Sequence, residues 1–204
     1  MTGPLVPGSE DPSTQLTTAV VIGCGLTGLA VASELSRRGV DSIVLSGLRG
    51  TDGPTLPRHP SGLAERADLL RVLRAYAAGH SLDVRQGTPA EDLGRVHGPG
   101  IPAPVPGSVK WSVSTGQGIL LADHVVLTSC AQVELRRLIR SLGFTAGGGL
   151  KTALRSAGLY LVGVGESLAP TTRELVRQAK RTGEDIALRN RNSVHGLILH
   201  PRSA

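Results

Sequence analysis

The sequence is poor in aromatic residues, with one Trp, two Tyr and one Phe among 204 residues. Proteins that bind single-stranded nucleic acid stack the bases on exposed aromatic rings, and so few rings cannot form such a platform. The net charge of +6 is compatible with a polyanionic partner, but the arginines are spread along the whole chain instead of forming a cluster. We therefore expect no nucleic-acid partner.

Cysteine is equally scarce, since Cys24 and Cys130 are the only two. Two cysteines cannot build a disulfide framework, and no Cys and His residues have the spacing of zinc ligands. No apolar run reaches the length of about 18 residues that a membrane-spanning helix needs, and the first residues lack the basic and apolar regions of a secretory signal. We expect a cytoplasmic protein without a metal site or a membrane partner, with both cysteines as small buried residues rather than a redox pair.

The first half of the chain alternates predicted strands and helices. Short β-branched runs predict strands at 18–22, 42–45 and 82–85, and apolar residues at helical spacing predict helices at 26–38 and 63–78. A β-α-β-α-β order implies a parallel sheet with right-handed crossovers. The stretch 46–62 is rich in Gly and Pro and is predicted to be a loop.

The second half begins with a Pro/Gly spacer at 96–108. The elements expected after it are a hairpin at 109–114 and 118–121, a strand at 123–130, a helix at 132–142, a flexible segment at 143–152, a strand at 158–165 and a helix at 171–190. Thr171 and Glu174 have the spacing of a capping box at the start of that last helix. We expect a disordered segment at 1–17, a single α/β domain at 18–190 and a C-terminal tail at 191–204.

A glycine motif stands at the end of the first predicted strand, in the stretch "AVVIGCGLTG". In Gly-x-Gly-x-x-Gly loops the first glycine makes the tight turn, the second lets the backbone approach a pyrophosphate, and the third lets the helix pack on the strand. The motif follows a strand and opens a helix inside a β-α-β unit, as dinucleotide binding requires. The candidate pyrophosphate-binding residues are Gly23, Cys24, Gly25, Leu26, Thr27 and Gly28. The alternative is that these glycines serve strand–helix packing alone.

Ser46 stands where a dinucleotide-binding domain usually has a carboxylate for the ribose, roughly 20 residues beyond the glycines. Two interpretations stay open. Ser46 and Arg49 together could accept a 2′-phosphate, which would indicate NADP. Alternatively, the ribose contact has been lost.

The order of four stretches resembles one protein family. These stretches are "VVIGCGLTGLAVASELSRRG", "YAAGHSLDVRQGT", "VKWSVSTGQGILLADHVVLTSC" and "GLYLVGVG" followed by "TTRELVRQAKRTGEDIA". They are similar to the flavin-containing monooxygenase-like branch of the FAD-dependent pyridine-nucleotide oxidoreductases, over most of 18–190. The resemblance implies a Rossmann-like FAD/NAD(P)-binding domain with a parallel sheet and a small β-hairpin insertion. It places Ala90 along the adenine, and Gly163 and Val164 at the ribityl chain and flavin edge.

The chain also departs from that family. Ser46 replaces a carboxylate, and Thr128, Ser129 and Cys130 replace Ala-Thr-Gly, so the Cys130 side chain would crowd the cofactor. The second, nicotinamide-binding domain that the family inserts between the positions of Cys130 and Gly158 is missing. Reduction by NAD(P)H in the family's manner would therefore not be available.

The leading expectation for function is a small FAD-dependent oxidoreductase of monooxygenase-like ancestry with one dinucleotide site. One alternative is a non-catalytic pseudo-oxidoreductase that has lost its cofactor and binds or regulates a partner subunit, and another is an NADP-binding reductase module. No catalytic residue can be assigned. Loss of the second domain would uncover apolar surface near Cys130 and Gly163, so we expect a second copy or a separate subunit to cover it.

Overall fold

The computed structural model describes residues 13–49, 63–96, 111–144, 147, 149–164 and 170–198. The predicted loop beyond Arg49 and the spacer beyond Val96 lie outside these residues, as do 1–12 of the predicted N-terminal segment.

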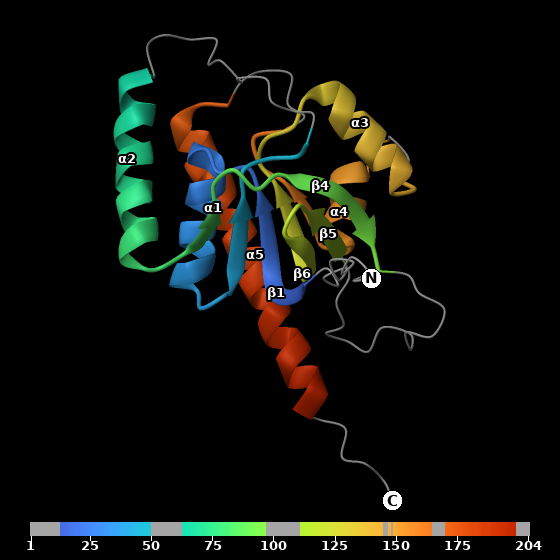
Figure 1. Cartoon of the computed structure of the whole chain (residues 1–204). Coiled ribbons are helices and arrows are strands. Elements are labelled where there is room, and N and C mark those ends of the chain that lie inside the picture. The colour runs from blue at the N-terminus through green and yellow to red at the C-terminus, as the bar shows by residue number, and fades with distance from the viewer. Residues whose placement is uncertain are drawn as a thin grey trace, which may run out of the picture.

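A parallel sheet forms the centre of the molecule (Figure 1). Its strands run in the order β3 (Asp83–Arg85), β2 (Ser42–Leu45), β1 (Thr14–Ile22), β6 (Gly118–Leu127) and β7 (Leu159–Leu161), each parallel to its neighbour. The first strand, β1, lies in the middle: β2 and β3 follow it on one side of the sheet, and β6 and β7 lie on its other side. The order in which the strands are added therefore changes side at β1. The α/β fold class predicted from the sequence is confirmed.

An antiparallel extension joins the same sheet through β6. The first half of β6 pairs with β5 (Trp111–Thr115), which pairs with β4 (Ala90–Arg95), whereas the last residues of β6 pair with β7. The predicted hairpin is therefore a three-stranded meander, and the strand predicted at 123–130 is the continuation of β6. The strand continues past Asp123 because β1 pairs with it on both sides of that residue, with 119–122 and with 124–127.

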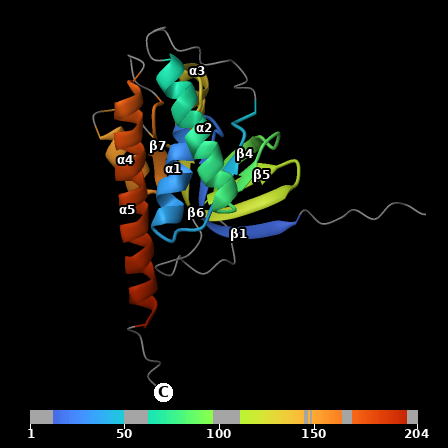
Figure 2. The same cartoon turned by 90° about the vertical axis from the view of Figure 1, so that its left-hand side faces the viewer.

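Helices cover both faces of the sheet (Figure 2). On one face α1 (Leu26–Arg37) packs against α5 (Thr172–Ile198), and α2 (Leu63–Gly79) packs on the outer side of α1. The other face carries α3 (Gln132–Ser141) and α4 (Leu150–Ser156). The result is a three-layer α/β/α domain.

Strand β1 shows why the sheet is buried on both faces. Ala19 and Val21 belong to the apolar cluster under α1 and α5, whereas Val20 and Ile22 belong to the cluster under α3 and α4. All four are fully buried. A continuous apolar run is typical of a parallel strand covered by helices on both sides.

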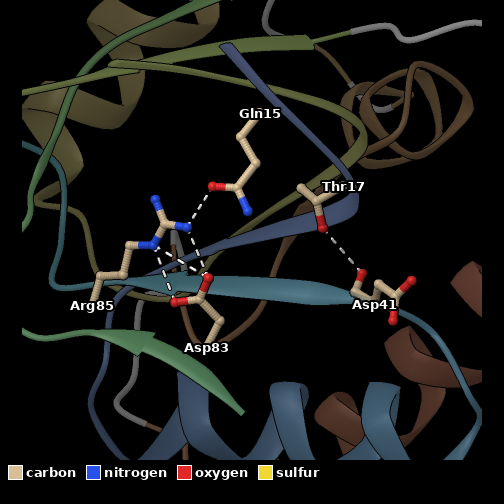
Figure 3. A network of polar contacts seen from close by, with 5 residues as sticks. All are labelled: Gln15, Thr17, Asp41, Asp83 and Arg85. Atoms are coloured by element: carbon tan, nitrogen blue, oxygen red, sulfur yellow. Dashed lines mark hydrogen bonds and ion pairs between the residues drawn. The ribbon is translucent and has the colours of Figure 1, made fainter. Parts of the chain in front are cut away.

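The amino end of β1 lies in the segment predicted to be disordered, which corrects that prediction for residues 14–17. Thr14 pairs with Ile119 of β6, and Gln15 accepts a hydrogen bond from Nη2 of Arg85 at 2.6 Å (Figure 3). Arg85 is held in turn by Asp83 at 2.8 Å. The polar sequence of this stretch suggested a coil, but its backbone is satisfied by the neighbouring strand.

Two helices also differ from the prediction. Helix α4 begins at Leu150, inside the segment predicted to be flexible, because burial of Leu154 (1 % exposed) fixes it on the sheet. Helix α5 continues to Ile198, into the predicted C-terminal tail. Half of the predicted capping box is present, since the Glu174 N–H donates to Thr171 Oγ1 at 3.2 Å.

In the part of the chain that the structure describes, no helix has the length and apolarity needed to cross a membrane.

Candidate nucleotide-binding site

The candidate site lies at the carboxyl end of β1, where the chain turns into α1. The N–H of Gly23 donates to the Leu45 carbonyl at 2.9 Å, and the N–H of Cys24 donates to the Ser46 carbonyl at 3.4 Å. Gly25 is the N-cap of α1. Because the strand order reverses at β1, this edge is the position where open α/β sheets bind their ligands.

Gly23 and Gly28 are required by the packing of the chain itself. Gly23 has a φ of +118°, and a Cβ there would lie 2.4 Å from Thr128 Oγ1. A Cβ on Gly28 would lie 1.7 Å from the Gly23 carbonyl oxygen. A side chain at either position is incompatible with the observed approach of helix and strand. The packing interpretation of the motif accounts for these two glycines.

Gly25 has no such role. Its φ is −76°, which any residue adopts, and a Cβ built there meets no atom within 4 Å. No hydrogen bond within the described residues uses the N–H groups of Gly25, Leu26, Thr27 or Gly28, and the first turn of α1 carries no acidic side chain. Open space, free N–H groups and the positive end of a helix dipole are the features of a phosphate-binding loop. These residues fit a diphosphate.

Thr128 is a site residue that the sequence did not identify. Its Oγ1 lies 3.0 Å from the Ile22 carbonyl oxygen and 3.2 Å from that of Gly23, so the hydroxyl donates to the backbone of the glycine loop. The signal was present, since Thr128 stands where the resembling family has Ala.

The two cysteines lie just beyond neighbouring parallel strands, as expected. Both are free, and both are half-buried instead of fully buried. Burial, together with the negative charge of Glu134, raises the pKa of the Cys130 thiol to about 11. The thiol is therefore neutral at physiological pH and a poor nucleophile.

The end of β7 lies beside the glycine loop. A Cβ built on Gly163 would lie 3.7 Å from Thr27 of α1 and 2.8 Å from Leu175 of α5, and the φ of Gly163 is +70°. Its N–H donates to Gln178 Oε1 at 3.1 Å. Gly163 therefore lies close to the start of α1, and its place at the ribityl chain and flavin edge stays a prediction of the resemblance. Val164 is 5 % exposed, and its side chain packs in the core cluster under α3 and α4.

Ser46 lies next to the glycine loop, but Arg49 is engaged elsewhere. The Arg49 guanidinium forms an ion pair with Glu91, with 2.6 Å between Nη1 and Oε1. A 2′-phosphate would therefore have to compete with a carboxylate for this side chain. Exposed pairs of this kind contribute about 0–1 kcal/mol, so the pairing weakens the NADP interpretation without removing it.

The backbone of Ala90 is hydrogen-bonded to the segment that follows β2. Its N–H donates to the Gly47 carbonyl at 2.7 Å, and its carbonyl accepts from the Arg49 N–H at 2.7 Å. The residue is 0 % exposed. Both backbone groups of Ala90 are therefore bonded to residues 47–49. The place of Ala90 along an adenine stays a prediction of the resemblance.

In the described part of the chain, no three His, Cys, Asp or Glu side chains are grouped so that they could hold a metal ion. Between Cys130 and Gly158 the described residues form α3 and α4 alone. No second glycine motif follows β6 there.

No protein-family model matches the sequence, and no curated protein matches it either. The structure is similar to that of Thermovibrio ammonificans THI4, with a TM-score of 0.55 and 14% identity, over 85% of this chain and 89% of that one. It also matches a thioredoxin reductase from Gloeobacter violaceus, with a TM-score of 0.38 and 21% identity over 57% of this chain. A cyclohexanone monooxygenase matches with a TM-score of 0.38 and 19% identity, again over 57% of this chain.

The chain spans 35% of the length of that thioredoxin reductase and 26% of that of the monooxygenase. TM-scores of 0.38 are too low for these two matches to show a shared fold over the whole chain. The likeness to THI4 extends over most of both chains and shows a shared fold. The described residues therefore have a Rossmann-like α/β fold, and between Cys130 and Gly158 those that the structure describes form the two helices α3 and α4.

Proposed function

We propose that this chain binds a dinucleotide by its diphosphate at residues 23–28, with FAD as the leading cofactor, and acts as a small FAD-dependent oxidoreductase. The observation that carries the proposal is Gly25. It is the glycine of the motif that the protein's own packing does not require, and the space beside it is open. A ligand that needs close backbone approach accounts for it.

The chain's own residues would hold the ligand in three ways. The N–H groups of Gly25, Leu26 and Thr27 would donate to phosphate oxygens, and the amino end of α1 would stabilise their charge. The Thr128 hydroxyl would keep the loop in the shape that aims those groups outward. A bound flavin supplies reversible acceptance of a hydride or of single electrons. We assign no catalytic acid, base or nucleophile.

An electron donor would have to come from outside the described residues. The described residues between Cys130 and Gly158 form two helices, α3 and α4, so a second copy or a separate subunit would cover the carboxyl end of the sheet and complete the site. Val133, at the start of α3 and close in sequence to Cys130, is 62% exposed and is available for such a contact. Monooxygenase-like ancestry belongs to this proposal and rests on the order of the sequence motifs.

The second candidate is a non-catalytic protein that binds or regulates a partner. It is favoured by the environment of Ala90, whose backbone groups are occupied by residues 47–49, and by Cys130 where the family has glycine. An NADP-binding module has less support, because Arg49 is paired with Glu91.

The visible absorption spectrum and an FAD titration of the purified full chain test the proposal. We expect flavin bands, or saturable FAD binding in the micromolar range, that the variant Gly25→Thr loses. Threonine is as good an N-cap as glycine, so the helix should form normally while the side chain fills the space beside the loop. Gly79→Thr is the matched control, because a Cβ at Gly79 also meets no atom within 4 Å, at the far end of α2. A colourless protein that binds no FAD would favour the partner-binding alternative.

A further inference from the structure

A cavity of about 280 Å³, which we call the edge cavity, lies beside β7 and between α4 and α5 (Figure 2). Within the described chain β7 pairs with β6 alone, so the sheet ends there. A helix with its side chains is about 10 Å wide, whereas neighbouring strands lie about 4.8 Å apart, so helices on both faces extend past the last strand. We propose that the edge cavity binds a small organic anion with an apolar body, at a site separate from residues 23–28.

The inner wall of the edge cavity is apolar. It is formed by Leu154 of α4 and by Leu159, Tyr160 and Leu161 of β7. The first three are almost completely buried, whereas Leu161 is half-buried. The Tyr160 hydroxyl already donates to Asp185 at 2.9 Å, so a ligand would meet the ring and not a free hydroxyl. A ligand with an apolar body gains by leaving water for such a wall, whereas an inorganic anion does not.

The outer rim of the edge cavity is basic. Lys151 of α4 and Arg181 of α5, which we call the rim cations, line the cavity and are exposed. Among the described residues, neither side chain forms an ion pair or a hydrogen bond. Lysine supplies a compact charge and arginine a planar pair of donors, and both suit a carboxylate. An anionic group in the cavity would therefore attract a cation from each of the two helices.

The other charged groups at the edge cavity already have partners of opposite charge. Glu174 lines the cavity, and its carboxylate pairs with Arg177, three residues further along α5. Arg155 lines it as well and pairs with Asp185 at 3.2 Å. The unmatched charge is therefore that of the rim cations, which favours anions over cations and neutral molecules. Apolar wall and basic rim together define the ligand class.

Titration of the isotope-labelled full chain with benzoate, followed residue by residue by NMR, tests the inference. Benzoate joins one carboxylate to one ring, whereas benzyl alcohol lacks the charge and inorganic phosphate lacks the ring. We expect the amide signals of Leu161, Gln178 and Thr182 to shift and to saturate with benzoate, with a dissociation constant below about 1 mM. At these residues, benzyl alcohol and phosphate should bind at least about tenfold more weakly.

Variants of the rim cations test the source of the charge. Lys151→Met and Arg181→Met each remove one charge and keep a long side chain that suits a helix. We expect each to weaken benzoate binding at least about threefold, and the double variant at least about tenfold. Arg136→Met on α3 is the matched control, because Arg136 is also exposed and has no ion pair among the described residues. It should leave benzoate binding unchanged.

Three results would overturn the inference. The first is the absence of a saturable benzoate shift at the edge cavity, or a shift of the amides of residues 25–27 in its place. The second is phosphate or benzyl alcohol binding as tightly as benzoate, because charge and apolar body would then not act together. The third is an equal loss of affinity in Arg136→Met. Benzoate binding at the edge cavity by a chain that binds no FAD would contradict the proposed function alone.

Discussion

Gly28 and Gly23 lie so close together that a Cβ on Gly28 would stand 1.7 Å from the Gly23 carbonyl oxygen. The oxygen belongs to backbone that also carries the Gly23 N–H bond to Leu45, so it cannot move aside freely. The contact fixes how closely the first turn of α1 approaches the end of β1. It thereby sets the position of the N–H groups proposed to bind phosphate.

Gly28→Ala should therefore destabilise the fold, by about 1–3 kcal/mol, because helix and strand must separate to admit one methyl group. Gly25→Ser is the control, since its Cβ meets no atom and serine is a good N-cap, and it should change stability by less than about 0.5 kcal/mol. Urea unfolding followed by circular dichroism measures both. Equal stability of the two variants would show that the close approach is not present in solution.

Thr128→Val removes a hydroxyl bond to the glycine loop and keeps the shape of the side chain. We expect a loss of about 0.5–1.5 kcal/mol, the ordinary contribution of one hydrogen bond, together with weaker FAD binding because the loop is held less firmly. Thr128→Ser keeps the hydroxyl and should retain the affinity. If the valine variant bound FAD as tightly as the serine variant, Thr128 would have no role in positioning the loop.

Asp185 links α5 to β7 and to α4. Its carboxylate accepts from the Tyr160 hydroxyl at 2.9 Å and pairs with Arg155 at 3.2 Å and Arg189 at 3.3 Å. Burial alone would raise the pKa of Asp185, but the hydrogen bonds from Tyr160 and Arg155 and the positive charges of Arg155 and Arg189 outweigh it and hold the pKa below its ordinary 3.8.

A depressed carboxyl pKa stabilises the folded state above pH 3.8, and this stabilisation is lost as the pH falls through the folded-state pKa. Wild type should exceed Asp185→Asn in stability by about 1–3 kcal/mol near pH 7. The gap should shrink steadily in acid. Unfolding curves across this pH range measure the gap, and a difference that stayed constant down to about pH 2 would contradict the ionic role of Asp185.

Cys130 should react slowly with alkylating reagents. With the pKa of its thiol raised to about 11 by burial and by Glu134, only about one molecule in a thousand is thiolate at pH 8. We expect alkylation by iodoacetamide to be at least about tenfold slower than that of free glutathione, and Glu134→Gln to speed it. Mass spectrometry of the Cys130 peptide gives the rates. Alkylation of wild-type Cys130 as fast as that of glutathione would contradict the raised pKa of the thiol and would make Cys130 a candidate redox or nucleophilic residue.

The architecture could be predicted largely from local patterns. The apolar run at 18–22 ends in Gly23, and such a run before a Gly-x-Gly-x-x-Gly predicts a buried strand and a crossover helix, as the structure has them. Helices α1, α2, α3 and most of α5 follow from apolar residues at helical spacing, which fits one buried face. Strand β4 was missed because its sequence, "AEDLGR", is polar, and it exists through pairing with β5.

Local patterns in the sequence predict the order of the elements other than β4 and α4, and the place of the glycine loop, because strand periodicity, helix periodicity and turn glycines act between near neighbours in the chain. Tertiary structure alone decided which glycines the packing needs, since the clash at Gly23 involves Thr128, more than a hundred residues away. The tertiary structure also decides that the backbone N–H and carbonyl of Ala90 bond to Gly47 and Arg49, and that the Arg49 side chain pairs with Glu91. Such contacts join segments distant in sequence, and they depend on how the strands are brought together in the sheet, which no local pattern encodes.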